Sequence, residues 1–309
     1  MHGARKSAEP LMGGLSFSDR AARSVWRIFP KRALSGAIGW GGRRNLPSAL
    51  RAAMLTRFAR IYGIDPSEAE KPIGEYAGFD DFFTRRLRPG ARPVDATPGR
   101  VVSTSDGKVV EAGLAVEGKL LQAKGVEFSL EELLGDASSA ARLTGGAYCI
   151  TYLSPKDYHR VHSPVAGRVT GWRHIPGVLF PVNARSVNRE PRLFVGNERF
   201  VTFIEGEAGF AAVVMVAAVG VGHVTASYDE EVATHRSQFL RSGVTHRWYD
   251  EPRPIDRGGE LGIFHLGSTS IVVFEPGRVT LDALQPGSPI KMGVGVGAFH
   301  PANDGSRGG

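Results

Sequence analysis

The residues at 262–274, GIFHLGSTSIVVF, place a small, hydroxyl-bearing sequence inside an apolar one. The apolar residues on both sides indicate a buried strand, yet Gly267-Ser268-Thr269 lies at its centre, where a sheet gains least from packing. A serine hydroxyl becomes a nucleophile when a neighbouring base takes its proton. Ser268 lacks the GxSxG pattern of hydrolases, because Leu266 and Thr269 occupy the nearest positions of that frame. By itself, this interruption does not identify a reaction.

Two histidines three residues apart are candidate bases. His159 and His162 lie in TYLSPKDYHRVHSPVAG, residues 151–167, beside Asp157. An extended chain would point the two side chains to opposite faces, whereas a turn could bring them together. A structural hydrogen-bonding role is the alternative for either histidine. Metal binding is a further alternative, but the sequence has neither an HExxH pattern nor a thiolate cluster, so we expect no metal site.

Asp106 is a further polar residue with two interpretations. In TSDGKVV it precedes a glycine, which is typical of a turn, and that role alone would account for it. Taken singly, neither Asp106 nor the residues above are diagnostic of a function.

A β-rich pattern must position these residues. From Val101 onward the sequence indicates short strands separated by Gly or Pro turns, within 100–113, 147–153, 163–177, 199–222 and 269–281. One helix is expected at 129–143, starting from an N-cap at Ser129 with Glu132 three residues later. Residues 66–88 indicate helical turns with loops. The sequence therefore predicts an α+β fold, with a helical, basic N-terminal segment followed by a β-rich domain of short strands.

Length and composition exclude several classes of protein. The 309 residues, 42% of them hydrophobic, can bury a sizeable core, so the chain is globular. The only cysteine, Cys149, excludes an intramolecular disulfide and a cysteine-based zinc site. The longest apolar run, 210–221, is too short to span a bilayer, and we expect neither a membrane-spanning helix nor a secretory signal peptide.

Positive charge is concentrated at the N-terminus. Residues 1–63 contain twelve Lys or Arg against Glu9 and Asp19, a local net charge of +10 within a total of +7. Apolar residues from Leu50 to Tyr62 recur there at helical spacing. Such a segment suits an anionic membrane surface; a solvated helix packed on the main domain is the alternative. Nucleic acid is not expected, because the bias is confined to one end and no recognised binding motif accompanies it.

Taken together, these residues resemble one family, the phosphatidylserine decarboxylases, which are pyruvoyl-dependent enzymes of phospholipid synthesis. The resemblance runs from about Leu34 to Val294, and its segments follow the family's order. The small departures are Ala166, where many relatives have Asp or Asn, and a Gly-rich strand at 216–224. The segments are FDDFFTRRLRPGARPVD (79–95), STSDGKVV (103–110), LQAKGVEFSLEELLG (121–135), YLSPKDYHRVHSPVAG (152–167), LFPVNARSVN (179–188), LFVGNERF (193–200) and ELGIFHLGSTSIVVFEPG (260–277).

The resemblance implies a self-cleaving enzyme. In relatives the chain cuts itself between the residues that match Gly267 and Ser268, which would leave a β chain of 1–267 and an α chain of 268–309. By this carry-over His162 is the base, Asp106 is its partner, and Ser268 becomes a covalent pyruvoyl group. The pyruvoyl group would form a Schiff base with the serine amine of phosphatidylserine and accept the electron pair released with CO2. His159 would then supply a proton or hold the substrate.

The resemblance also suggests partners and a location. Residues 1–63 would be a basic, amphipathic membrane-association segment and residues 64–309 the catalytic domain. We expect peripheral attachment to the cytoplasmic side of the cell membrane, a heterodimer of the protein's own α and β chains, and a homodimer of these pairs. The alternatives are a pyruvoyl-dependent decarboxylase of a soluble amino acid and a non-catalytic membrane-binding protein.

Overall fold

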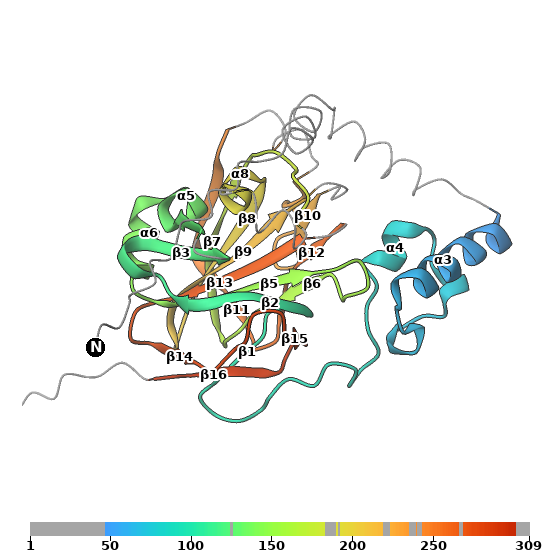
Figure 1. Cartoon of the computed structure of the whole chain (residues 1–309), viewed down its shortest axis with the longest axis horizontal. Coiled ribbons are helices and arrows are strands. Elements are labelled where there is room, and N and C mark those ends of the chain that lie inside the picture. Colours follow the sequence, from blue (N-terminus) through green and yellow to red (C-terminus); the bar gives the residue numbers. More distant parts are fainter. Residues whose placement is uncertain are drawn as a thin grey trace, which may run out of the picture.

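The computed structural model describes residues 47–123, 126–182, 190, 192–218, 223–234, 239, 243–265 and 268–300. Within these residues short strands predominate, and the helices gather in an N-terminal unit and against one sheet (Figure 1). The predicted α+β fold is confirmed.

An eight-stranded antiparallel sheet forms the centre of the molecule. Its strand order is β11-β7-β8-β9-β13-β5-β2-β15, so strands far apart in the sequence lie side by side. The strand that begins at Ser268 therefore lies inside the sheet, between two neighbours. The strands are β2 (Gly107–Leu114), β5 (Ala147–Leu153), β7 (Gly167–Ile175), β8 (Arg199–Gly206), β9 (Gly209–Ala217), β11 (Thr245–Ile255), β13 (Ser268–Phe274) and β15 (Pro289–Ile290).

Three smaller sheets accompany the central one. They are β1-β16-β14, β10-β12-β6 and the hairpin β3-β4. Because β12 and β13 are consecutive in the chain but belong to different sheets, the interruption in GIFHLGSTSIVVF marks the passage from one sheet to another. The strands are β1 (Arg100–Val102), β3 (Lys119–Ala123), β4 (Val126–Ser129), β6 (Arg160–His162), β10 (Val224–Ala226), β12 (Glu260–Phe264), β14 (Val279–Leu281) and β16 (Gly295–Phe299).

Strand β13 is apolar on both faces because both faces of the central sheet are covered. Ile271 and Val273 pack in one hydrophobic cluster, and the alternate residues Val272 and Phe274 pack in a second one. This alternation follows from the two-residue period of a strand. Burial of each such side chain stabilises the fold by about 1.5–3 kcal/mol. Packing on both faces therefore fixes the position of the strand that begins at Ser268.

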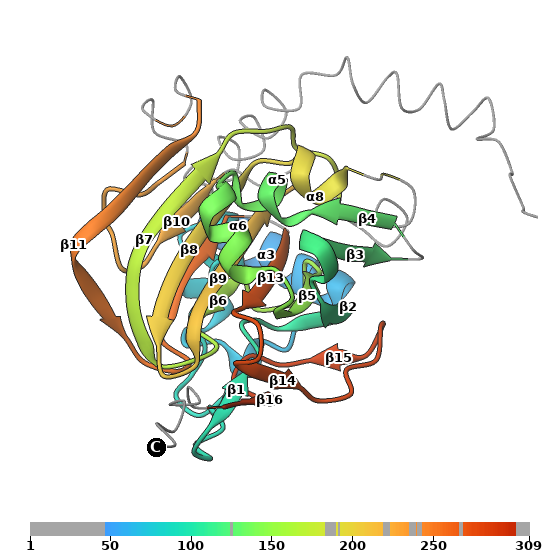
Figure 2. The same cartoon turned by 90° about the vertical axis from the view of Figure 1, so that its left-hand side faces the viewer.

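The first cluster is completed by α5 (Leu130–Leu134), α6 (Ala137–Leu143) and α8 (Leu193–Gly196), which gather on one side of the sheet (Figure 2). The Ser129 cap is confirmed, since its hydroxyl accepts a hydrogen bond from the Glu132 amide at 3.3 Å. The prediction of one helix over 129–143 is wrong. Gly135 adopts a left-handed conformation with φ of 62°, which ends α5, and the Asp136 carboxylate caps α6 by accepting from the Ser139 amide.

The N-terminal unit has a small core of its own. It consists of α3 (Ser48–Tyr62), η1 (Pro66–Glu68), η2 (Ile73–Glu75) and α4 (Phe79–Phe83), and it projects from one end of the molecule (Figure 1). Its buried cluster includes Leu55 and Ala59 before residue 63, and Tyr76 and Phe82 after it. The proposed boundary at residue 63 stays a prediction, and residues 1–46 of that segment lie outside the described residues. None of the helices that the structure describes is long and apolar enough to cross a membrane.

Candidate active site

Ser268 is the first residue of β13. In the ladder its Cα lies opposite Leu153 of β5 and Ala217 of β9. Gly267, the other residue of the predicted cleavage site, lies outside the described residues. The structure therefore places the start of the predicted α chain inside the central sheet.

Thr104 connects three parts of the site. Its hydroxyl lies 2.9 Å from that of Ser270, two residues after Ser268. Its carbonyl accepts a hydrogen bond of 2.8 Å from the amide of His162 in β6. Asp106 follows two residues later in the same loop. Sequence reasoning missed this junction, whose only signal was its place in the family segment STSDGKVV.

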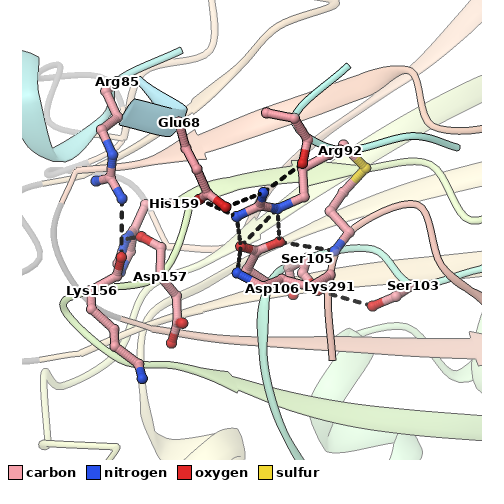
Figure 3. Close-up of polar contacts among 12 residues, drawn as sticks. Glu68, Arg85, Arg92, Ser103, Ser105, Asp106, Lys156, Asp157, His159 and Lys291 are labelled. Atoms are coloured by element: carbon pink, nitrogen blue, oxygen red, sulfur yellow. Dashed lines mark hydrogen bonds and ion pairs between the residues drawn. The ribbon is translucent and has the colours of Figure 1, made fainter. Parts of the chain in front are cut away.

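Asp106 is buried in an ion pair and does not form an exposed turn (Figure 3). Its carboxylate accepts from Arg92 at 2.8 and 2.6 Å and from the Met292 amide at 2.9 Å. The same guanidinium pairs with Glu68 at 2.8 Å. Burial acts to raise the pKa of Asp106, but the Arg92 hydrogen bonds, the Met292 amide and the Lys291 charge outweigh it and lower the pKa. Asp106 is therefore a fixed negative charge near neutral pH.

Gly107 allows this position of Asp106. Its φ is +152°, and a Cβ at residue 107 would lie 2.2 Å from the carbonyl oxygen of Tyr152. Any larger residue would therefore push β2 away from β5. The glycine after Asp106 is therefore required by the close packing of β2 against β5.

His162 is held as a neutral base. Its Nδ1 lies 2.8 Å from the carbonyl oxygen of Gly258, so Nδ1 carries the proton and donates it. Its Nε2 is buried and has no partner among the described residues. Burial lowers the pKa of His162, although the Gly258 carbonyl and the Glu260 carboxylate partly oppose this. Nε2 is therefore an unprotonated acceptor at neutral pH.

His159 has the same arrangement. Its Nδ1 lies 2.8 Å from the Asp157 carbonyl oxygen, and its Nε2 is buried without a partner among the described residues. Burial lowers its pKa to about 3, and its ring lies 3.9 Å from that of Phe83 in α4. The His159 carbonyl accepts from the Phe264 amide at the end of β12. This hydrogen bond holds the loop that carries His159 against the end of β12, just before residues 266 and 267.

The predicted site residues are not all in direct contact. In the part of the chain that the structure describes, no hydrogen bond joins Asp106 to His162, and the two are linked through the backbone of Thr104. Backbone carbonyls, from Gly258 and Asp157, orient both histidines. Sequence reasoning also missed Arg92, whose only signal was its place in the GARP part of a family segment.

Metal ligands and the cysteine thiol are the other groups that could do chemistry. Among the described residues no group of three or more His, Cys, Asp or Glu side chains could hold a metal ion. Cys149 is buried in β5, and burial raises the pKa of its thiol to about 11, so the thiolate nucleophile is scarce at neutral pH.

Comparison with known proteins decides the family. The family model for phosphatidylserine decarboxylase matches residues 79–298, which include the histidine loop, the Asp106 loop and β13. The chain belongs to the phosphatidylserine decarboxylase family. It is accordingly an enzyme of the carboxy-lyase class.

Curated relatives extend the match over nearly the whole chain. A phosphatidylserine decarboxylase proenzyme of Myxococcus xanthus (strain DK1622) is 44% identical over 283 residues, which cover 91% of this chain and 99% of the relative. That of Anaeromyxobacter sp. (strain K) is 45% identical over 281 residues, with the same two coverages. That of Bordetella avium (strain 197N) is 41% identical over 283 residues, covering 90% and 95%. The name proenzyme describes these relatives as precursors.

The residues present fit the pyruvoyl group that this family implies. Such a group has two adjacent carbonyl oxygens, and the chemistry around it requires proton donors and acceptors. His159 and His162 each offer one buried ring nitrogen that has no partner among the described residues. Buried polar atoms are usually hydrogen-bonded, so these two nitrogens, within the segment that the family model matches, are available to that group and its substrate. His174 in β7 also has a buried ring nitrogen without a partner among the described residues, so this feature alone does not mark the site.

Proposed function

We propose that the protein is a precursor that cuts itself between Gly267 and Ser268 and then decarboxylates phosphatidylserine to phosphatidylethanolamine and CO2. The observation that carries this proposal is the pair of neutral, buried histidines, each with one ring nitrogen fixed by a backbone carbonyl and the other left without a partner in the described part of the chain. The His159 carbonyl accepts a hydrogen bond from the Phe264 amide, four residues before Ser268. The His162 amide donates to Thr104, whose hydroxyl contacts that of Ser270, two residues after Ser268.

In the maturation step, Nε2 of His162 takes the proton of the Ser268 hydroxyl, which attacks the carbonyl carbon of Gly267. The peptide C–N bond breaks as the ester C–O bond forms, and the nitrogen of residue 268 receives a proton. Loss of the α proton of residue 268 then breaks the ester, which leaves a Gly267 carboxylate and dehydroalanine. Tautomerisation and hydrolysis release ammonia and leave the pyruvoyl group. Asp106 supports His162 through the Thr104 loop.

In the decarboxylation step, the pyruvoyl group supplies an electron sink for the pair released with CO2. His159 would deliver a proton from Nε2 to the carbon that has lost CO2, or hold the substrate in place. The low pKa of this buried imidazole favours its neutral form, so it can relay a proton only while transiently charged. Phe83, in contact with the imidazole, excludes water from this side of the ring.

The proposal is tested by the denatured intact mass of the purified protein and by release of CO2 from phosphatidylserine. We expect two species, with the fragment from residue 268 onward lighter than its sequence by one ammonia, because elimination removes the elements of water from residue 268 and hydrolysis of the resulting imine then adds water and releases ammonia. A single uncut chain that turns over no lipid would overturn the proposal. Turnover of free amino acids without lipid would instead favour a soluble substrate.

We also propose that α3 docks the enzyme on an anionic membrane, together with residues 1–46. Leu50, Met54 and Ile61 lie on one side of α3 at helical spacing and are 57%, 37% and 65% exposed. Arg57 and Arg60 are exposed on the same helix and would attract anionic lipid. The opposite side of α3 packs in the buried cluster that contains Phe82 of α4. Phe82 precedes Phe83 in the sequence, and the ring of Phe83 contacts that of His159. Docking of α3 would therefore bring the site close to its lipid.

Replacing Leu50, Met54 and Ile61 together by Ser is expected to weaken binding to phosphatidylserine vesicles by at least about tenfold, because each exposed side chain no longer buries apolar surface in lipid. Vesicle flotation measures the bound fraction. The control is Ala53→Ser, an exposed position on the same helix. Equal binding of the triple variant and the control would show that α3 is not the docking surface.

A further inference from the structure

Arg85 is a buried cation with an incomplete set of partners. The residue is 4% exposed, and among the described residues its Nη2 donates a hydrogen bond to the Lys156 carbonyl at 3.0 Å. Nε and Nη1 have no hydrogen-bond partner there, and the guanidinium also lies over the Phe82 ring at 5.4 Å. Burial accordingly lowers the pKa of Arg85. A buried guanidinium with two free donor atoms is costly unless an anion completes it.

Arg85 lines a pocket of about 190 Å³ that has further cations at its edge. Lys108, Lys156 and Lys291 also line it, and all three are exposed. This volume is below the roughly 300–1,000 Å³ of pockets that enclose drug-sized ligands, so the pocket suits a headgroup fragment and not an acyl chain. Figure 3 shows Arg85 alongside His159 and the Lys156 backbone, next to the ion pair of Arg92 and Asp106.

The acidic side chains of the pocket are already engaged. Asp106 and Glu68 both bind Arg92. Asp157 accepts from the amide and hydroxyl of Ser154, and Asp65 accepts from the Ser67 amide. By contrast, the structure describes no ion pair for Arg85, Lys108 or Lys156. Asp157 and Asp65 keep their charge, but the lining has five basic residues against four acidic ones, a net charge of +1, which favours an incoming anion.

The pocket lies beside the start of β13. Ser154, in its wall, follows Leu153, whose Cα lies opposite that of Ser268. In a phosphoserine headgroup four bonds separate the amine nitrogen from phosphorus, a contour of at most about 6 Å at roughly 1.5 Å per bond. A headgroup whose amine is held at residue 268 would therefore extend toward the Ser154 wall of this pocket.

We propose that the Arg85 pocket binds the phosphodiester of the lipid headgroup. This inference rests on the proposed function. Phosphate is favoured over the substrate carboxylate by the reaction itself: the carboxylate loses its charge as CO2 leaves, so a guanidinium bound to it would stabilise the substrate more than the transition state. The phosphate keeps its charge throughout, and Arg matches its oxygens with a planar fork of donors.

The experiment compares Arg85→Gln with Arg86→Gln, the exposed neighbour that does not line the pocket. With a soluble short-chain phosphatidylserine, we expect Arg85→Gln to raise KM roughly 10- to 100-fold, the loss typical of a charge-assisted hydrogen bond, with a smaller change in kcat. Arg86→Gln should match the wild type. Glycerol phosphate should inhibit the wild type competitively and acetate should not. An unchanged KM in a fully cleaved Arg85→Gln protein, or competition by acetate alone, would overturn the proposal.

Two further measurements keep the test decisive. If Arg85→Gln does not mature, the double variant Lys108→Gln with Lys156→Gln replaces it, and an unchanged KM in that variant counts against the pocket. Binding of glycerol phosphate to the uncleaved Ser268→Ala chain, followed by ³¹P NMR, does not need the pyruvoyl group. Binding of glycerol phosphate to this uncleaved chain would support the pocket even if the proposed reaction failed. If the further substitution Arg85→Gln left this binding unchanged, the proposed pocket would be refuted.

Discussion

Replacing Ser268 by Ala is expected to leave one uncut chain and to reduce lipid decarboxylation to the background of the assay. The methyl group cannot attack the Gly267 carbonyl, so neither the ester nor the pyruvoyl group can form, and no ordinary side chain replaces that electrophile. Intact mass and CO2 release from phosphatidylserine vesicles measure the two losses. The fold should be unchanged, because β13 is held by Ile271 to Phe274 in the two clusters.

The control for this substitution is Ser288→Ala. Ser288 also lies in the predicted α chain, and its hydroxyl donates to the Gln285 carbonyl in an exposed loop. The control should be cut normally, with its small fragment lighter by one oxygen atom. Decarboxylation by an uncut Ser268→Ala chain would contradict both the site and the mechanism.

The second large effect distinguishes the roles of the two histidines, one in self-cleavage and the other in decarboxylation. His162→Gln is expected to slow self-cleavage by about 10²–10⁴-fold, the usual contribution of a general base, because an amide cannot accept the Ser268 proton. His159→Gln is expected to be cut at a near-normal rate and then to decarboxylate lipid about 10²–10⁴-fold more slowly. A time course of cleavage on gels, followed by CO2 release from the matured fraction, measures the two effects independently.

His174→Gln is the matched control for loss of a buried histidine. His174 lies in β7 and bonds Glu198 at 3.2 Å, outside the proposed site. This variant shows how much any buried imidazole contributes to folding alone. Equal defects in cleavage and turnover for the His159 and His162 variants would refute the division of roles, and so would a normal cleavage rate in His162→Gln.

Much of the fold could be predicted because it depends on local patterns. The continuous apolar strand at 147–153 is β5 as expected, and the run at 199–222 became the hairpin of β8 and β9. The capping of Ser129 is also a local interaction and was predicted correctly. The prediction of a single helix over 129–143 was wrong, because the left-handed Gly135 ends one helix and Asp136 caps the start of another.

The sequence by itself determined the family, and with it which residues are expected to react. The types and order of Asp106, His159, His162 and Ser268 pointed to the family, and the family model covers them all. A serine hydroxyl needs a nearby base before it can attack a carbonyl, so a serine and two histidines in these segments agree with the expected cleavage. The pairing of Asp106 with His162, however, came from resemblance and stays a prediction.

Only the tertiary structure decided how these residues are held. Asp106 is paired with Arg92, fourteen residues earlier, and with the Met292 amide from the far end of the chain. His162 is oriented by the Gly258 carbonyl, and Arg85 has two donor atoms without a hydrogen-bond partner among the described residues. These contacts join segments that only the strand order of the central sheet and its neighbours brings together. Local patterning cannot specify them, because the free energy of each contact arises from burial that the whole fold creates.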